Sequence, residues 1–275
     1  YMGDTLFFNT IRNFVNAHKF QSINSIQFRD YLTAQSGIDL TDYFNNWIFA
    51  PGFTHFSIDS SHVIPAGSDF NVSVFMRQRK HHATDYYNHV PLEVAFYNDL
   101  MIPSIYKLEF NGRCMQFNVT LPFNPTMIVI DPDSKISDAI TEEQKMVYAP
   151  VNIIFNQAKC KVMVKSVILS GDSTLVRAEH NWIAPDRFKN SLNFPGYVLC
   201  DSRYWKIDGI HLQNIKGLLQ FSYEVGLSNS YLDSNWVKNT EDSIRLFYRQ
   251  DSRDEWQFAD DSLIAGSLTD GHGLI

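Results

Sequence analysis

The chain has 275 residues, of which 44% are hydrophobic, 14% aromatic and 19% charged. This composition supports a substantial buried core and excludes an intrinsically disordered chain. The formal net charge of -7 argues against nonspecific binding to nucleic acid, which depends on clustered Lys and Arg.

Residues 1–50 have the spacing of short helices, because apolar side chains recur every three or four positions. Pro51-Gly52 then stops helix formation. The apolar side chains nearest to that stop, Tyr43, Phe44 and Trp47, are expected to pack on the region that follows. Three helices are predicted, at residues 4–20, 25–36 and 41–48.

Beyond residue 52 the apolar pattern changes to every second residue, which is typical of β-strands. Phe70, Val72, Val74 and Met76, for example, share one face of a strand. Short strands separated by Pro, Gly, Asn or Asp indicate a β-sandwich. Six strands are predicted, at residues 53–61, 70–77, 90–97, 106–110, 113–121 and 127–130.

A second β-rich region is predicted after Asp131-Pro132-Asp133, and the polar residues 134–148 are expected to form a short helix or a linker. Its candidate strands are residues 161–169, 174–182, 204–207, 217–225, 243–248 and 256–258. The chain is thus predicted to be mainly β with an N-terminal α-helical segment. The predicted parts are helical residues 1–50, a β-sandwich at 51–137 and a second, immunoglobulin-like sandwich at 138–275.

Four short motifs in the helical part follow one another in an order known from zinc peptidases. They are Gly3-Asp4 with Phe7 and Phe8, Ile11-Arg12, Ser36-Gly37-Ile38-Asp39-Leu40, and Trp47 followed by Pro51-Gly52-Phe53. This order resembles the C-terminal end of the thermolysin-like catalytic domain in gluzincin aminopeptidases of the aminopeptidase N and leukotriene hydrolase type. The family's usual Pro after the last aromatic is Thr54 here. In that family a β-sandwich directly follows the Trp.

No H-E-x-x-H motif occurs in the sequence, although that motif supplies two zinc ligands and the general base in such enzymes. The resemblance places the family's catalytic residues upstream, and Tyr1-Met-Gly-Asp does not match the context of its catalytic tyrosine. The resemblance therefore implies no catalytic, cofactor-binding or metal-binding residue in this chain. Zinc is expected in the full-length parent.

The resemblance implies the non-catalytic C-terminal portion of a secreted, periplasmic or extracellular zinc aminopeptidase, which removes N-terminal residues from peptides. The expected partners are the upstream catalytic half of the same polypeptide and, in the parent, the peptide substrate. No apolar run reaches the ~18 residues of a transmembrane helix. The second β region resembles C-terminal extensions of large bacterial secreted aminopeptidases at residues 172–177, 179–180 and 204–210. The alternative is a stand-alone tandem β-sandwich module that binds carbohydrate or protein.

One cluster of histidines and acids, His81, His82, Asp85 and His89, precedes a predicted strand. A metal site needs three or four ligands that converge on one point, and an exposed hairpin loop is favoured for this cluster over a metal site. The acid pairs Asp131/Asp133 and Asp260/Asp261 do not fit the EF-hand pattern and are expected in surface turns.

Glu179 and His180 are expected on opposite faces of a strand, which favours a hydrogen-bonded core histidine over a catalytic pair. A triad of Ser173, His180 and Asp172 lacks a nucleophile elbow and is given little weight.

Sugar or peptide stacking is considered for Tyr86, Tyr87, Tyr204 and Trp205, and core or rim packing is favoured for most of them. The three cysteines, Cys114, Cys160 and Cys200, are interpreted as buried small hydrophobes.

Overall fold

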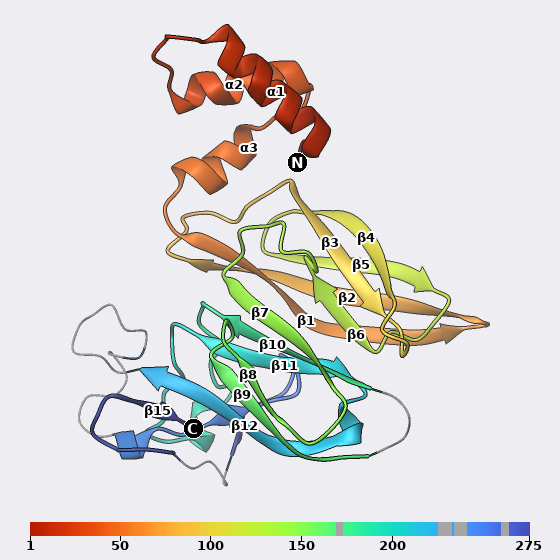
Figure 1. Cartoon of the computed structure of the whole chain (residues 1–275), viewed down its shortest axis with the longest axis vertical. Coiled ribbons are helices and arrows are strands. Elements are labelled where there is room, and N and C mark those ends of the chain that lie inside the picture. Colours follow the sequence, from red (N-terminus) through yellow and green to blue (C-terminus); the bar gives the residue numbers. More distant parts are fainter. Residues whose placement is uncertain (169–172, 225–232, 234–240, 260–263) are drawn as a thin grey trace.

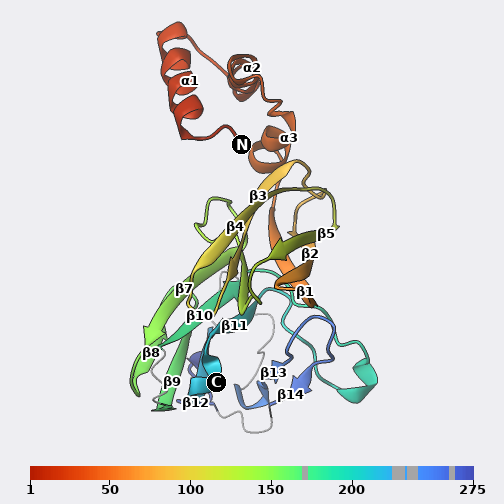
Figure 2. The same cartoon turned by 90° about the vertical axis from the view of Figure 1, so that its right-hand side faces the viewer.

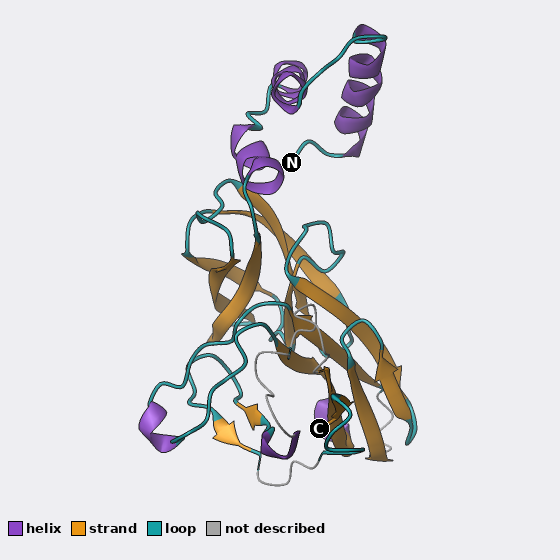
Figure 3. Cartoon of the chain, turned by 90° about the vertical axis from the view of Figure 1, so that its left-hand side faces the viewer, coloured by secondary structure: helices purple, strands orange, loops and turns teal. Residues whose placement is uncertain are grey.

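The structure is a computed structural model of the chain, and it describes residues 1–168, 173–224, 233, 241–259 and 264–275. It is mainly β, with short N-terminal helices and several small antiparallel sheets, as the sequence predicted (Figure 1). The helices lie at one end of the molecule. The C-terminus lies in the β region at the other end (Figure 3).

The helical part consists of α1 (Asp4–Ala17), α2 (Ser25–Ser36), α3 (Thr41–Tyr43) and a π-helical turn, Phe44–Phe49. Asn24 and Gln27 cap α2 reciprocally, because each side chain accepts a hydrogen bond from the other residue's backbone N–H, at 2.9 and 3.0 Å. Gly37 ends α2 in the left-handed conformation. A small cluster of buried Leu32, Leu40 and Phe44 holds the helices together.

The first β unit contains two three-stranded antiparallel sheets that share one core. One sheet pairs β1 (Phe53–Ala66), β2 (Asp69–His81) and β5 (Cys114–Leu121) in the order β1-β2-β5. The other pairs β4 (Pro103–Phe110), β3 (Val90–Tyr97) and β6 (Met127–Ile130) in the order β4-β3-β6. Alternation along the strands sends apolar residues such as Val72, Val74, Val94 and Phe96 into the core between the sheets.

The second β unit is also built from two antiparallel sheets, which use later strands of the chain (Figure 2). One sheet has the order β11-β10-β7 and the other β15-β12-β9-β8. Their strands are β7 (Ile140–Val147), β8 (Asn152–Phe155), β9 (Cys160–Val167), β10 (Thr174–Asn181), β11 (Tyr204–Ile210), β12 (Ile215–Glu224) and β15 (His272–Leu274). A short hairpin, β13 (Phe247–Tyr248) with β14 (Gln257–Phe258), lies beside them. Single 3₁₀ turns occur at Ser191–Asn193, Leu212–Asn214 and Glu241–Ser243.

Several local predictions need correction. Residues 140–147, expected in a helix or linker, form strand β7 because Glu142 reaches the buried guanidinium of Arg177 on the neighbouring β10. The predicted strand 243–248 shrinks to β13, and the short strands β8 and β15 were not predicted. The predicted strand ends at Leu169 and Val225 lie outside the described residues.

The expected packing of the third helix is correct for one of three aromatic residues. Trp47 packs on the core of the first β unit, with its ring 4.9 Å from that of Tyr87. Phe44 and Tyr43 pack instead with Leu32 and Leu40 among the helices, because α3 turns them back toward α2.

The two β units meet through an apolar contact at one end of their shared boundary. Met127 and Val129 of β6 are buried there against Leu175 of β10 and Ile210 of β11. Every residue of β10 is buried, although Arg177, Glu179 and Asn181 are polar. The first β unit therefore covers a polar face of the second. None of the described helices is long and apolar enough to cross a membrane.

Candidate functional site

A cavity of about 1140 Å³ lies along the boundary between the two β units. One wall comes from β1, β2 and the chain around β6, and the facing wall from β11, β7 and β10. The segment 245–256 closes a third side. This volume is slightly above that of most small-molecule sites, which are usually about 300–1,000 Å³, so the cavity has room for a small ligand.

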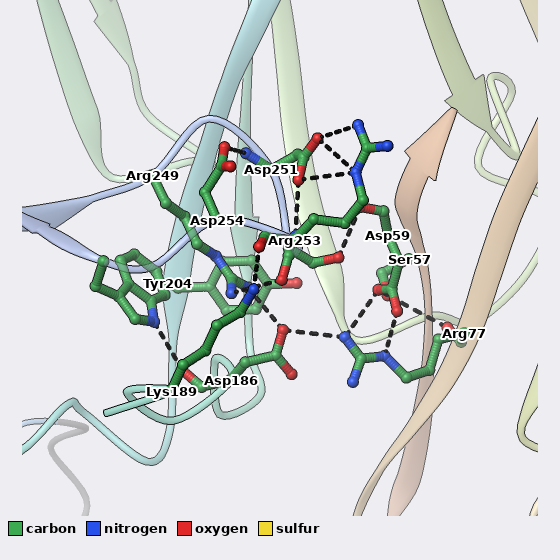
Figure 4. A network of polar contacts seen from close by, with 12 residues as sticks. Ser57, Asp59, Arg77, Asp186, Lys189, Tyr204, Arg249, Asp251, Arg253 and Asp254 are labelled. Carbon is green, nitrogen blue, oxygen red and sulfur yellow. Dashed lines mark hydrogen bonds and ion pairs between the residues drawn. The ribbon is translucent and has the colours of Figure 1, made fainter. Parts of the chain in front are cut away.

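Three arginines converge on Asp186 beside this cavity, and Figure 4 shows two of them, Arg77 and Arg249. Arg79 holds the carboxylate with two parallel hydrogen bonds, of 2.8 and 3.1 Å. Arg77 and Arg249 each donate to Oδ2 of the same carboxylate, at 3.0 and 2.7 Å. Arg77 also binds Asp59, with Nε 2.7 Å from Oδ2. The Asp186 carboxylate therefore connects β2 of the first unit to the C-terminal segment.

Local strand geometry places the two arginines of β2 on one face of their sheet. Arg77 and Arg79 are two apart on β2, so they share the face that points away from the apolar core. A β-bulge leaves Asp59 without a partner in the β1–β2 ladder and lets it turn toward Arg77.

Opposing effects set the protonation of Asp186. Burial alone would raise the pKa of this carboxyl, but the hydrogen bonds and charges of Arg79, Arg249 and Arg77 outweigh it and hold the pKa well below its usual range. Asp186 is therefore ionised at neutral pH.

The segment 249–256 also binds the backbone at Asp59 and Asp186 through side chains other than Arg249. Ser252 donates its hydroxyl to the backbone oxygen of Asp59 at 2.7 Å, and the Trp256 indole N–H donates to the backbone oxygen of Asp186 at 2.9 Å. The Arg249 guanidinium lies over the Trp256 ring, 4.5 Å from its centroid.

A chain of hydrogen bonds runs through the middle of the cavity wall. His55 Nδ1 lies 2.9 Å from Asp138 Oδ1, and His55 Nε2 lies 3.3 Å from the Tyr204 hydroxyl. The other oxygen of Asp138 accepts the backbone N–H of Phe56 at 3.0 Å. Burial is the main cause that raises the pKa of Tyr204 above its ordinary value, so its phenol stays protonated.

A second charged cluster occupies the polar face of the β11-β10-β7 sheet. The fully buried Arg177 binds Glu142 and Glu179, and its Nη1 lies 3.4 Å from Asp208. Lys206 lies 2.8 Å from the same Asp208. Because three carboxylates face two cations, this cluster has an excess of negative charge.

The carboxyl groups of this second cluster titrate differently. Burial raises the pKa of Glu142, and the nearby Glu179 adds to the rise. Burial would also raise the pKa of Glu179, but the charges of Lys206 and Arg177 lower it below its ordinary value. The cluster therefore pairs a carboxyl that takes up a proton readily with one that stays ionised.

The predicted His/acid cluster does not converge. His89 pairs with Asp42 of α3 at 2.6 Å, and the His81 ring stacks on that of Phe53, 4.6 Å away. Within the described ranges, no group of three or more His, Cys, Asp or Glu side chains is arranged to hold a metal ion. Of the nearby aromatics, Tyr87 is buried and Tyr86 lies beneath Lys80.

His180 is a core residue, as predicted, but the predicted hydrogen bond is wrong. Its ring lies 4.1 Å from that of Trp182 and 4.9 Å from that of Trp205. In the part of the chain that the structure describes, neither ring nitrogen has a hydrogen-bond partner. Burial, reinforced by the charges of Arg203 and Lys159, lowers the pKa of His180 to about 3.

The other sequence candidates have structural roles or lie outside the described residues. Asp131 is buried rather than at the surface as predicted, and it accepts the backbone N–H groups of Lys135 and Ile136. Asp133 is exposed as predicted and pairs with Lys135 at 3.0 Å. Asp172, Asp260 and Asp261 lie outside the described residues. Cys114, Cys160 and Cys200 are free thiols; Cys160 is buried as predicted, whereas Cys114 is exposed and Cys200 is only half-buried.

Sequence reasoning singled out Tyr204 as a stacking candidate but missed the charged residues of the cavity. Arg77 and Asp186, for example, are 109 positions apart, so no local motif joins them. The available signal was the alternation of Arg77 and Arg79 on a strand whose other face is apolar. A scan against protein-family models finds no match for the chain, and a search of curated proteins also finds none.

Proposed function

We propose that this chain is the non-catalytic C-terminal portion of a secreted zinc aminopeptidase that removes N-terminal residues from peptides. In this proposal the helices are the end of a thermolysin-like catalytic domain, and the two β units are sandwiches that follow it. The zinc belongs to the upstream half of the same polypeptide. The observation that carries the proposal is the uncovered apolar surface of α1.

Helix α1 is apolar on more than the face that it buries. Only Thr10 and Phe14 are buried in it, whereas Leu6, Phe7, Phe8 and Val15 are 36 to 61% exposed. Exposed apolar side chains that gather on one element mark an interaction site. A preceding helical half would cover them and gain roughly 25 cal/mol for each Å² of apolar surface removed from water.

The joint between the helices and the first β unit supports a fixed placement of the two. The Trp47 indole N–H donates to the Tyr1 hydroxyl at 3.1 Å, and its ring packs on Tyr87. Gly52 follows with a φ of 79°, pressed against the backbone of residues 81–83. This joint agrees with the family's order of helices, Trp and β-sandwich.

The test compares the native polypeptide with the 275-residue chain. The native polypeptide, recovered from the periplasm or the medium, is expected to contain one zinc ion per chain and to hydrolyse aminoacyl anilides; the 275-residue chain is expected to do neither. Zinc-dependent hydrolysis by the 275-residue chain would contradict the proposal. A native polypeptide without zinc would favour the tandem binding module instead.

A substitution on α1 tests the proposed contact directly. Phe8→Ser is expected to change the stability of the 275-residue chain by less than about 0.5 kcal/mol, because Phe8 is 61% exposed there. In the native polypeptide the same substitution is expected to cost about 2 kcal/mol, since it removes a buried aromatic contact. Leu192→Ser, at an 85% exposed residue of the second β unit, is the matched control and is expected to be neutral in both.

A further inference from the structure

We propose that the cavity between the two β units binds a short peptide through both of its charged ends. The peptide carboxylate would bind at Arg79 and Arg249, and the peptide ammonium would lie toward Glu179 and Asp208. This site is separate from the zinc chemistry proposed above, and the inference does not depend on that proposal.

One end of the cavity has an excess of positive charge. Arg77, Arg79 and Arg249 face two carboxylates, those of Asp59 and Asp186, which leaves one positive charge. Further along the same wall, Arg253 and Asp251 neutralise each other at 2.6 Å. This end therefore attracts an anion.

The geometry at that end fits a carboxylate. Arg79 binds both oxygens of Asp186 with its two terminal nitrogens, which is the planar fork arrangement that guanidinium and carboxylate groups prefer. Arg249 uses Nη2 for Asp186, and its Nη1 donates a long, 3.4 Å hydrogen bond to the Ser252 backbone oxygen. The Arg249 guanidinium therefore has donor capacity for a second carboxylate.

The other end of the same cavity has the opposite charge. Glu142, Glu179 and Asp208 all line the cavity, and the cations that face them are Arg177 and Lys206. One negative charge remains there. A ligand with a carboxylate at one end and an ammonium group at the other therefore fits the charge of the cavity.

Tyr204 lies between the positive and the negative end of the cavity, and its position gives the scale of the distance between them. Its ring centroid is 6.0 Å from the Arg79 guanidinium, and Lys206 lies two residues further along the same face of β11. Two residues of strand span about 7 Å. The two ends are therefore on the order of 10 Å apart, a distance that an extended peptide of three residues spans at about 3.3–3.6 Å per residue.

Asp186 acts in this proposal as a built-in competitor for the ligand. It lies on residues 182–190, which form no helix or strand, so its carboxylate is not fixed by a strand ladder. A peptide carboxylate would displace it or share the guanidinium groups with it. Removing the Asp186 charge is thus expected to strengthen peptide binding.

The experiment measures calorimetric binding of trialanine to the 275-residue chain at low salt. We expect trialanine to bind, and trialanine amide and N-acetyl-trialanine each to bind at least tenfold more weakly, because each lacks one terminal charge. D186N is expected to raise the affinity for trialanine about fivefold, and Arg249→Gln to lower it about tenfold. Arg187→Gln, an exposed neighbour of Asp186, is the matched control and is expected to leave the affinity unchanged.

Equal affinities for the free and the blocked peptides would overturn the proposal. So would the absence of binding by both the wild-type chain and D186N up to about 10 mM peptide. Thermal unfolding of each variant shows whether a loss of binding reflects a loss of folding, and the blocked peptides test the wild-type chain without any substitution. A zinc chelator is expected to have no effect, which separates this site from a zinc-dependent one.

Discussion

The hydroxyl group of Tyr204 lies 3.3 Å from Nε2 of His55, across the boundary between the second and the first β unit. In the tautomer in which Nδ1 of His55 donates to Asp138, Nε2 is the acceptor and the Tyr204 hydroxyl is the donor. Three segments that are far apart in sequence are thereby joined in one hydrogen-bonded chain beside the cavity.

Tyr204→Phe is expected to lower the free energy of unfolding by about 1–3 kcal/mol, because it leaves the buried Nε2 of His55 without a donor. Urea unfolding followed by tryptophan fluorescence measures the change. Tyr248→Phe is the control: Tyr248 is 50% exposed, and its loss of a hydroxyl is expected to cost less than about 0.5 kcal/mol. Equal effects of the two substitutions would show that the bond to His55 does not stabilise the boundary.

His180→Phe is expected to stabilise the fold by about 1–3 kcal/mol at neutral pH. The buried ring has no hydrogen-bond partner among the described residues, so its two nitrogens lose their hydration without compensation. Phe has a similar shape between the Trp182 and Trp205 rings. Chemical unfolding at pH 8 is the measurement, and a destabilisation would mean that His180 has a partner in solution.

The same residue makes the fold sensitive to acid. The pKa of His180 is lowered to about 3 in the folded chain, and its ordinary value is about 6.5. The unfolded chain therefore binds the proton more readily, so the stability contributed by the neutral ring is complete above pH 6.5 and is lost as the pH falls toward 3. The loss is at most about 1.4 kcal/mol for each pH unit. In His180→Phe this part of the pH dependence should disappear, whereas His62→Phe, at an exposed histidine, should retain it.

Gly52→Ala is expected to destabilise the chain by more than about 3 kcal/mol, through strain and close contact together. A Cβ at residue 52 would lie 2.4 Å from the backbone of Ala83 and His81, and φ is already 79°. Gly37→Ala is the matched control, since φ is similar at 70° but no atom lies within 4 Å of the added carbon. It should cost about 1 kcal/mol. Similar losses in thermal unfolding would refute the close approach at Gly52.

Asp186→Asn is expected to cost about 2 kcal/mol at pH 7, because Arg77, Arg79 and Arg249 lose their shared counter-charge. The pKa of Asp186 is held below its ordinary value, so the charge stabilises the fold above about pH 4 and this stabilisation is lost as the pH falls further. The wild-type and variant stabilities should therefore converge in acid. A difference that is constant from pH 7 to pH 3 would point to packing instead of charge.

Local periodicity predicted much of the β architecture, and long-range charge pairing explains what it missed. Strands such as Val90–Tyr97 and Met127–Ile130 were predicted with their observed bounds, because one face of each meets an apolar core. Strand β7 was missed because Glu142 looks like a solvent-exposed residue until Arg177 is placed beside it. The cavity was missed for the same reason, since Arg79 and Asp186 come together only in the folded chain.

The division of the β region near residue 137 stays a prediction, and the structure shows how to test it. The sequence predicts preferred proteolysis between residues 131 and 151. The first part of that span is tied down: Asp131 accepts two backbone N–H groups, Asp138 binds His55, and the Ala139 N–H donates to the Thr54 backbone oxygen. The turn after β7 is open, with Tyr148 68% exposed.

Chymotrypsin is therefore expected to cut first after Tyr148, inside the second β unit. Strand β7 would then remain on the N-terminal fragment while it stays hydrogen-bonded to β10 on the other. The two fragments should elute together in gel filtration and separate only in denaturant, and Tyr148→Ala should suppress the cut. Early cleavage by trypsin after Lys135, with fragments that separate and each retain a β core, would show instead that the two units fold independently as the sequence predicts.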